Sequence, residues 1–185
     1  MEAIDALLNR ASVGRLTEPA PSAEQLEVMF QAAQRAPDHG QLRPWRFLVL
    51  EGPARERLGE ILAQAGQAKG GEVNQAAVDK ARGMPLRAPM VIVAIARLQE
   101  HPKVPKSEQS LAAGCATHGL ILAAHALGVG AIWRTGELSY SAHVAKSLGV
   151  LEGEQIIGFI YLGSPEKGPK PISPAPVEAF VQRWP

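Results

Sequence analysis

SEQSLAAGCATHGLILAAHAL, residues 107–127, is the longest stretch of helical character in this 185-residue sequence. Alanine, glycine and leucine occupy almost every face of the expected helix, so it has no broad polar face. A helix of this kind is buried in the middle of a protein or packed against a second copy of itself. Gly128 ends the stretch, because glycine readily takes the left-handed conformation that closes a helix. We therefore expect a central helix around which the other elements are arranged.

The flanking segments alternate between helical and strand patterns. Residues 89–96, PMVIVAIA, are apolar and β-branched, which is typical of a strand covered on both faces. Ser22 with Gln25 three residues later forms a capping-box pattern, which predicts a helix that runs to about Arg35. Further helices are expected at residues 3–9, 53–67, 73–82 and 141–148, and further strands at residues 45–50, 131–133 and 155–162. The alternation predicts an α/β or α+β fold with helices on a small sheet.

Length and charge exclude several classes of protein. With 46% hydrophobic residues, residues 1–185 fit one compact domain. The 19 basic and 18 acidic residues are scattered, so neither a nucleic acid nor a membrane surface is expected as a partner. The single cysteine, Cys115, excludes an internal disulfide framework and favours a reducing compartment. Without a signal-peptide pattern or a membrane-spanning apolar run, we expect a cytoplasmic protein.

The last segment, residues 163–185, is rich in proline and cannot form a core of its own. It nevertheless ends with the apolar residues Phe180, Val181 and Trp184. Extended segments with apolar anchors usually dock on a surface. We expect this tail to lie against its own domain or against a partner subunit.

The segment NRASVGRLTEPAP, residues 9–21, places Arg10, Ser12 and Arg15 in one short turn between two expected helices. Two guanidinium groups and a hydroxyl can hold a phosphate through charge-assisted hydrogen bonds. The same residues could equally form a solvated basic patch. The turn is therefore a candidate phosphate site, with both interpretations open.

Two more polar clusters lie at junctions between expected elements. His39 follows a helix in the loop APDHG, where it could contact a ligand or only stabilise the turn. Trp133, Arg134 and Thr135 end an expected strand. They could form the wall of a site for a planar, anionic ligand, or they could be an ordinary amphipathic strand end.

Three common kinds of site are not supported by the sequence. Gly128 begins a pattern that resembles the dinucleotide fingerprint, but Trp133 occupies the place of the third glycine and the pattern precedes a strand. Cys115, His118 and His125 could share a helix face, but no second cluster offers a fourth zinc ligand, so buried structural residues are favoured. No G-x-S-x-G nucleophile elbow occurs.

These clusters, in their order and spacing, resemble the nitroreductase family of FMN-dependent oxidoreductases, and within it a small, minimal branch of NAD(P)H nitroreductases. The resemblance extends over nearly the whole chain and is carried by the segments NRASVGRLTEPAP, RAPDHGQLRPWRFLVLEG, KARGMPLRAP, HPKVP, the AAGCA helix, GAIWRTG and IIGFIYLGSP. It implies an α+β, nitroreductase-like fold in which helices wrap a central mixed sheet around a long central helix. It also implies a homodimer, with FMN in two equivalent sites at the subunit interface.

The same resemblance implies which residues bind the cofactors. Arg10, Ala11 and Ser12 would contact FMN, with Arg10 and Ser12 at its phosphate and ribityl end. Further FMN contacts would come from Arg35, His39, Trp133, Arg134 and Thr135. NADH or NADPH, as the electron donor, would contact the segment Ala123, Ala124, His125, Ala126, Leu127 and Gly128. That helix end is too apolar to hold a charged nucleotide unaided, and no metal is implied.

Two departures from the family pattern concern the surroundings of the flavin. Ala11 stands where the family usually carries a basic residue, and Gly14 stands where it often carries another. Fewer positive charges near the flavin pyrimidine would stabilise the reduced flavin anion less. The chain is also short for the family, which predicts a more open pocket.

The resemblance implies a ping-pong reaction at one flavin face. NAD(P)H transfers a hydride to flavin N5 and leaves, and a planar acceptor such as a nitroaromatic or a quinone is then reduced at the same face. No catalytic side chain is required. The alternatives are a non-catalytic FMN carrier or redox sensor, a different reaction on the same fold such as reductive dehalogenation, and a structural dimer without a cofactor.

Overall fold

The computed structural model describes residues 1–67, 74–168, 173 and 175–184. At its centre lies a sheet in which β5 (Glu154–Pro165) pairs on one edge with β3 (Met90–Arg97), and β3 pairs with β2 (Trp45–Glu51). Two shorter strands, β1 (Leu16–Thr17) and β4 (Gly130–Arg134), also pair with β5. Every pair among the described strands is antiparallel. The expectation of a mixed sheet, with parallel as well as antiparallel pairs, is therefore wrong for the described strands. An apolar strand buried on both faces is compatible with either direction of pairing, and its sequence pattern therefore could not decide between them.

Strand β3 is covered on both faces, as its apolar sequence predicted. Val91, Val93 and Ile95 face one hydrophobic core, whereas Met90 and Ile92 face the other. The alternation follows from the two-residue repeat of a strand. Burial on both sides explains why β3 carries apolar residues at almost every position.

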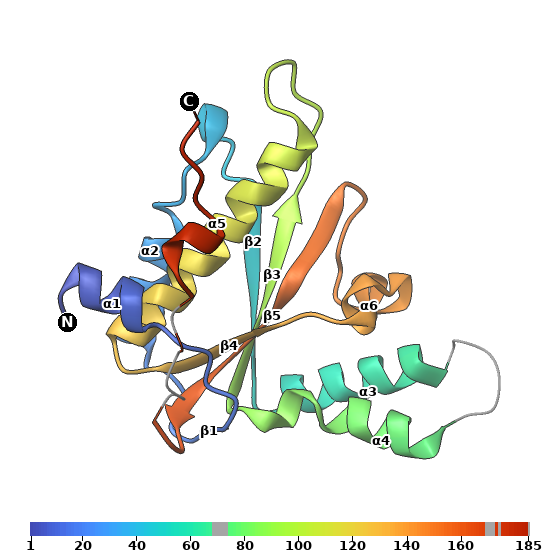
Figure 1. The fold of residues 1–185 in the computed structure, drawn as a ribbon. Helices are drawn as coiled ribbons and strands as arrows, with labels where there is room; N and C mark the ends of the chain where they lie inside the picture. The colour runs from blue at the N-terminus through green and yellow to red at the C-terminus, as the bar shows by residue number, and fades with distance from the viewer. Residues whose placement is uncertain (68–73, 169–172, 174, 185) are drawn as a thin grey trace.

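The helices cover the sheet in two layers (Figure 1). On one face, α2 (Ala23–Ala33) packs beside α5 (Lys106–Ala126), and both contribute to the core around Ile92 and Ile160. The other face is covered by α3 (Pro53–Gln67), α4 (Gln75–Gly83) and α6 (Ala142–Ser147). The short helix α1 (Ala3–Asn9) contacts α5. Short turns of 3₁₀ helix lie between these elements: η1 (His39–Gln41), η2 (Pro85–Arg87) and η3 (Glu137–Tyr140). A further turn, η4 (Val177–Ala179), lies in the C-terminal tail.

The predicted capping box at the start of α2 is confirmed. The Ser22 hydroxyl accepts a hydrogen bond from the Gln25 amide at 3.2 Å, and the Gln25 side chain accepts one from the Ser22 amide at 2.9 Å. The helix ends at Ala33, before the expected limit near Arg35. Helix α4 begins at Gln75, with the Asn74 side chain as its cap, whereas the predicted start at residue 73 lies outside the described residues.

Helix α5 is central, but it is buried on one side only in the single chain. Ala116, Leu120 and Ala124 are fully buried against α2 and the sheet. On the opposite side, Leu111 is 70% exposed and Cys115 is exposed as well. The expected burial is therefore wrong for the outer side of α5 in one chain, because none of the described elements other than α1 covers that side. Packing against a second copy stays a prediction.

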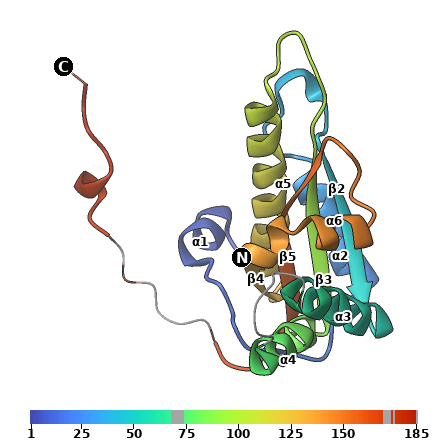
Figure 2. The ribbon, with the colours of Figure 1, turned by 90° about the vertical axis from the view of Figure 1, so that its right-hand side faces the viewer.

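The C-terminal tail does not pack on its own domain where it is described. Figure 2 shows the end of the chain well away from the helices and the sheet. Phe180 is 70% exposed and Trp184 is 96% exposed. Docking of the tail on its own domain is therefore not found for its described residues. Docking on a partner subunit stays a prediction. None of the helices within the described part of the chain is long and apolar enough to cross a membrane.

Candidate functional site

Two hollows lie on opposite faces of the sheet, near the end of β4. The first, called here the α3–α4 cavity, has a volume of about 440 Å³, and its lining includes Leu62, Val78, Lys80, Met84, Arg87, Arg134, Thr135, Glu137, Phe159 and Tyr161. The second, called here the α1–α5 groove, has a volume of about 910 Å³, and its lining includes Leu7, Arg35, Leu111, Cys115, His118, Leu122, Ala123, Ala126 and Trp133. Both fall in the size range of small-molecule sites.

Trp133, Arg134 and Thr135, at the end of β4, were expected to form one wall of a ligand site, but they line two different hollows. Successive side chains along a strand point to opposite faces. Trp133 therefore lines the α1–α5 groove, whereas Arg134 lines the α3–α4 cavity. Thr135 follows the last residue of β4, so it is not bound by this alternation, and it lines the cavity as well. The side chains of Trp133 and Arg134 thus serve different hollows, although they are neighbours in the sequence.

The position of Trp133 is set by the neighbouring strand. Its indole N–H donates a hydrogen bond to the Ile157 carbonyl at 3.2 Å. The ring lies over Gly158, where a Cβ atom would be only 2.2 Å from the indole nitrogen. Glycine at this position leaves the space that the indole occupies. The wall of the groove is therefore built by β4 and β5 together.

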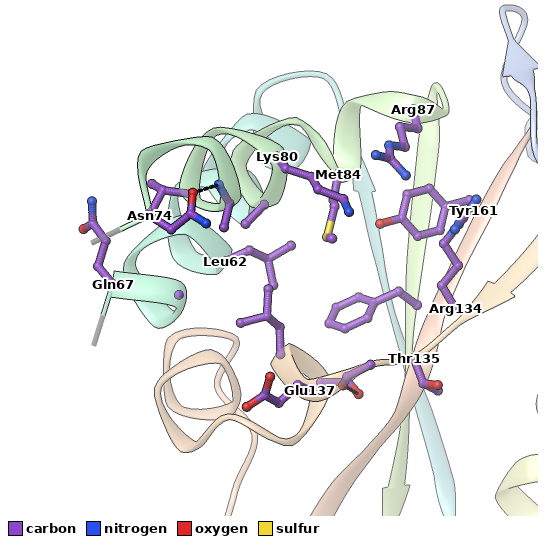
Figure 3. A pocket seen from close by; sticks show the side chains of 18 residues that line it. Leu62, Gln67, Asn74, Lys80, Met84, Arg87, Arg134, Thr135, Glu137 and Tyr161 are labelled. Atoms are coloured by element: carbon purple, nitrogen blue, oxygen red, sulfur yellow. Dashed lines mark hydrogen bonds between the residues drawn. The ribbon is translucent and has the colours of Figure 1, made fainter. Parts of the chain in front are cut away.

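The α3–α4 cavity combines an apolar floor with a cationic wall (Figure 3). Leu62, Met84 and Phe159 supply apolar surface. Among the described lining residues, the charged side chains are Lys80, Arg87 and Arg134, which are basic, and Glu137, which is acidic. Figure 3 shows Arg87, Tyr161 and Arg134 gathered at one end of the cavity. The lining suits a flat apolar molecule that carries negative charge.

Arg134 and Tyr161 form the inner part of this wall. The Arg134 guanidinium carbon lies 5.7 Å from the centre of the Tyr161 ring, within the range of a cation–π contact. The Arg134 Nε atom is buried and has no hydrogen-bond partner among the described residues. A buried donor of this kind usually has a partner, so a ligand atom in the cavity is a natural one.

Burial raises the pKa of the Tyr161 phenol, while the positive charges of Arg134 and Arg87 oppose that rise. Both cations therefore lie close enough to influence the phenol. Because the pKa is raised above its ordinary value of 10.0, the phenol is protonated at neutral pH and can donate a hydrogen bond.

The α1–α5 groove is apolar by comparison. Arg35 contributes its one charged side chain, counting the described lining residues alone. Leu7 and Leu111, which line it, are more than half exposed in the single chain. A long, open and apolar hollow of this kind is typical of a surface that another molecule covers.

The segment expected to contact a nicotinamide nucleotide is divided between the groove and the core. Ala123 and Ala126 line the groove, and Ala124 is buried in the core. His125 is half-buried, and its Nε2 atom has no hydrogen-bond partner among the residues described. Leu127 and Gly128 are exposed. The segment supplies no cation to the groove, and its role in nucleotide binding stays a prediction.

Cys115 and His118 do share the outer face of α5, where both line the groove. They were expected to be buried structural residues, and this is wrong because that face is uncovered in the single chain. In the part of the chain that the structure describes, no group of three or more His, Cys, Asp or Glu residues could hold a metal ion.

The turn after α1 leaves two of its polar side chains available. The Val13 amide donates to the Ala131 carbonyl at 2.9 Å and so holds the turn against β4. Within the described residues, the side chains of Arg10 and Ser12 make no hydrogen bond or ion pair, whereas Arg15 lies 3.7 Å from a Glu166 oxygen. Arg10 and Ser12 thus retain free donors for an anion.

His39 lies in η1, and its Nδ1 atom is 2.7 Å from a carboxylate oxygen of Glu108 on α5. Both side chains are about half exposed. The pair orients the imidazole, which supports a defined position for the ring rather than a freely moving one. His39 lines neither hollow in the single chain.

The single chain therefore distributes the expected flavin residues over several places. Arg35 and Trp133 share the groove, and Arg134 and Thr135 share the cavity. Arg10, Ala11, Ser12 and His39 line neither hollow. This dispersal is consistent with a site that two protomers build together.

Most residues of the cavity lining were not predicted as site residues, and they include Lys80, Met84, Arg87 and Tyr161. Lys80, Met84 and Arg87 all lie within the family segment KARGMPLRAP, to which no role was given. Tyr161 lies within IIGFIYL, which was interpreted only as a core strand. The available signal was a tyrosine in an otherwise aliphatic strand, since a buried phenol usually needs a polar partner.

The model of the nitroreductase family matches residues 7–164. The chain is 46% identical over 90% of its length, and 90% of the relative's, to an Escherichia coli K12 protein named "Putative NAD(P)H nitroreductase YdjA". A nitroreductase-like family protein from Bacillus cereus has the same fold, with a TM-score of 0.86 and 20% identity over all of this chain and 96% of that one. A Desulfovibrio desulfuricans protein, described as a nitroreductase in complex with FMN, matches with a TM-score of 0.74 and 26% identity over 98% and 96% of the two chains.

The extent of these matches settles the class. The family match covers most of the sequence, and the antiparallel sheet with helices on both faces is the fold of the solved relatives. The chain belongs to the nitroreductase family.

Proposed function

We propose that this protein is a dimeric flavoenzyme whose α3–α4 cavity receives the ring system of FMN, and which reduces a flat acceptor at the expense of NAD(P)H. Its family and its relatives make it an FMN-dependent NAD(P)H oxidoreductase. The assignment of residues, the dimeric site, the ping-pong order and the class of acceptor are the proposal.

The observation that carries the assignment is the lining of the α3–α4 cavity. Arg134 and Thr135, two of the residues expected to contact FMN, meet there with an apolar floor and with a buried guanidinium nitrogen that lacks a partner. The flat apolar ring system of FMN matches the apolar floor, and the polar atoms along the edge of the ring can pair with that nitrogen. When bound in this cavity, FMN would supply the redox chemistry between NAD(P)H and the acceptor.

The protein contributes binding and orientation. Arg10 and Ser12 offer unpaired donors in a turn fixed to β4, and they are assigned to the phosphate and ribityl end. Tyr161 and Arg134 offer a neutral donor and a positive charge inside the cavity. Ala11 contributes its backbone to the same turn. No side chain needs to act as a nucleophile or general base.

A second copy of the chain would complete the site. Arg35 and His39 lie away from the α3–α4 cavity of their own chain, so each cavity would receive them from the partner. The apolar side chains on α1 and on the outer face of α5 supply a surface for the contact, because Ile4, Leu8 and Leu111 are all more than 60% exposed. The tail, with Phe180 and Trp184 exposed, would dock on the same partner.

Residues 123–128 are assigned to the nicotinamide nucleotide only as an apolar contact surface. Their side chains can offer apolar contacts, while charge recognition must come from elsewhere. We also place the enzyme in the cytoplasm, because an exposed lone cysteine suits a reducing compartment.

The experiment that tests the function is an absorbance spectrum of the purified protein, taken with and without FMN and then after anaerobic addition of NADH or NADPH. Bound flavin that bleaches supports the reductase. Bound flavin that stays yellow with both nucleotides would instead support a carrier or sensor. A protein that takes up no FMN would contradict the assignment of the cavity and of Arg10 and Ser12.

A further inference from the structure

The positive charge of the α3–α4 cavity extends from its interior to its mouth. Arg134 is half-buried and lies against Tyr161, whereas Arg87, in the turn before β3, is exposed. Lys80 on α4 is exposed on the same rim. Glu137 is the single acidic side chain among the described lining residues, so the lining carries a net charge of +2 from three cations and one acid.

The phosphate of FMN does not account for this charge in the proposed arrangement. Its donors are Arg10 and Ser12, and neither lines the cavity. The oxidised flavin ring is neutral, so it does not compensate the net positive charge of the described lining. Charged side chains on the wall of a cavity raise the local concentration of ligands of opposite sign.

We propose that the wall formed by Arg87 and Arg134 makes the enzyme select flat acceptors that carry a carboxylate or a similar anionic group, with nitroaryl carboxylates as the substrate class. This inference rests on the proposed function, since it concerns the acceptor of the same site. The guanidinium groups would bind the carboxylate, while the ring of the acceptor would stack on the flavin that covers the apolar floor.

The reaction with such an acceptor is balanced by the donor already assigned. A nitrobenzoate, NAD(P)H and one proton give a nitrosobenzoate, NAD(P)⁺ and water. The donor loses a hydride, which carries two electrons, and one N–O bond of the nitro group is broken. The released oxygen leaves as water with the transferred hydrogen and the added proton.

The test compares 4-nitrobenzoate with the neutral 4-nitrobenzyl alcohol, which has a similar size. In the FMN-loaded protein, Arg87→Gln should lower the ratio of their kcat/KM values about fivefold, as expected for one partly exposed charge. Arg87→Lys should retain most of the ratio. Arg57→Gln, at an exposed arginine of α3 that does not line the cavity, should leave it unchanged.

Salt provides an independent test. Raising the ionic strength should lower the ratio in the wild type and have less effect in Arg87→Gln, because screening acts on the same interaction. An equal fall of both kcat/KM values in Arg87→Gln, or a shift of the flavin reduction potential with the ratio unchanged, would overturn the proposal. The charge would then serve the flavin.

Benzoate, which cannot be reduced, separates this inference from the proposed function. Its binding to the oxidised holoprotein is followed by the change in the flavin spectrum, and its binding to the protein without FMN by calorimetry. Weaker binding to Arg87→Gln than to Arg57→Gln supports the anion site even if no nucleotide is oxidised. Equal binding to the two variants contradicts it, even if the protein proves to be an active reductase.

Discussion

The α3–α4 cavity and the α1–α5 groove lie on either side of one short strand, and they differ in how much of a site one chain completes. The cavity has its apolar floor, its cations and its phenol from a single chain. The groove has an apolar surface with one charged side chain among its described residues, and much of it is exposed. The cavity thus has its charged groups from one chain, whereas the groove, which we assign to a second copy, is nearly uncharged.

The difference shows that residues adjacent in the sequence can line two different sites. Trp133 and Arg134 are adjacent, yet one lines the surface assigned to the partner and the other lines the cavity assigned to the flavin. Under the proposed function, the short strand β4 would therefore connect dimer assembly to cofactor binding. Changes on the groove side should act first on the dimer, and only through it on the flavin.

The largest effect is expected from placing a charge in the groove. Leu111→Glu would bring two glutamates into a two-fold interface, where burial of an unpaired charge is costly. We expect the dimer dissociation constant to rise by at least about a thousandfold, with a loss of bound FMN. Sedimentation velocity and flavin absorbance measure both quantities.

The matched control is Leu151→Glu, at a leucine that is 68% exposed and lies outside the groove. It should leave the dimer intact. If Leu111→Glu also left the sedimentation coefficient unchanged, the assignment of the groove to a second copy would be wrong.

A large effect on stability, without an effect on either hollow, is expected at Arg46. Its guanidinium makes two hydrogen bonds to the Glu154 carboxylate, at 2.7 and 2.6 Å, and Glu154 is only 8% exposed. Arg46→Leu would leave that carboxylate with Arg97, 3.9 Å away and largely exposed, as its remaining cation, and would cost about 3 kcal/mol of unfolding free energy. Urea unfolding measures the loss, and FMN affinity should be unchanged in the folded protein.

The same pair predicts a dependence of stability on pH. The hydrogen bond from Arg46 holds the pKa of Glu154 below its ordinary value of 4.5. Stability from this pair is therefore fully present above that value, and it is lost as the pH falls through the lowered pKa in the folded state. Urea unfolding between pH 7 and pH 3 should show a smaller decrease for Glu154→Gln than for the wild type. Identical pH profiles would contradict the role of the pair.

A smaller effect on stability is expected at Gly158 of β5, which lies against the Trp133 indole. Gly158→Ala would place a methyl group against the Trp133 indole, and overpacking of this kind costs about 2 kcal/mol. Thermal unfolding and tryptophan fluorescence would show lower stability and a displaced indole. Gly83→Ala, where no atom lies within 4 Å of an added Cβ, is the control and should be nearly neutral. Equal stability of the two variants would show that Trp133 is not held as described.

The smallest effect is expected from removing the tail. Deletion of residues 168–185 should weaken the dimer and the binding of FMN about tenfold, since docked aromatic anchors each add modest stability to an interface. Analytical ultracentrifugation and FMN titration test this directly. An unchanged sedimentation profile and flavin content would mean that the tail does not dock on the partner.

Several elements could be predicted because their signals are local. The capping box depends on Ser22 and Gln25, which are only three residues apart. The burial of β3 follows from its run of apolar residues. Lys80, Arg87 and Tyr161 were not predicted as site residues because they come from three separate segments. Their meeting depends on how α4, η2 and β5 pack.

The sequence by itself determined the family, the helices and strands, and the long apolar helix at the centre, because these follow from short-range periodicity and from motifs read in order. Only the tertiary structure decided that the sheet is antiparallel where described, that Trp133 and Arg134 face different hollows, and that α5 leaves one side uncovered. Strand direction, side-chain facing and burial depend on which distant segments become neighbours, and no local pattern encodes that choice.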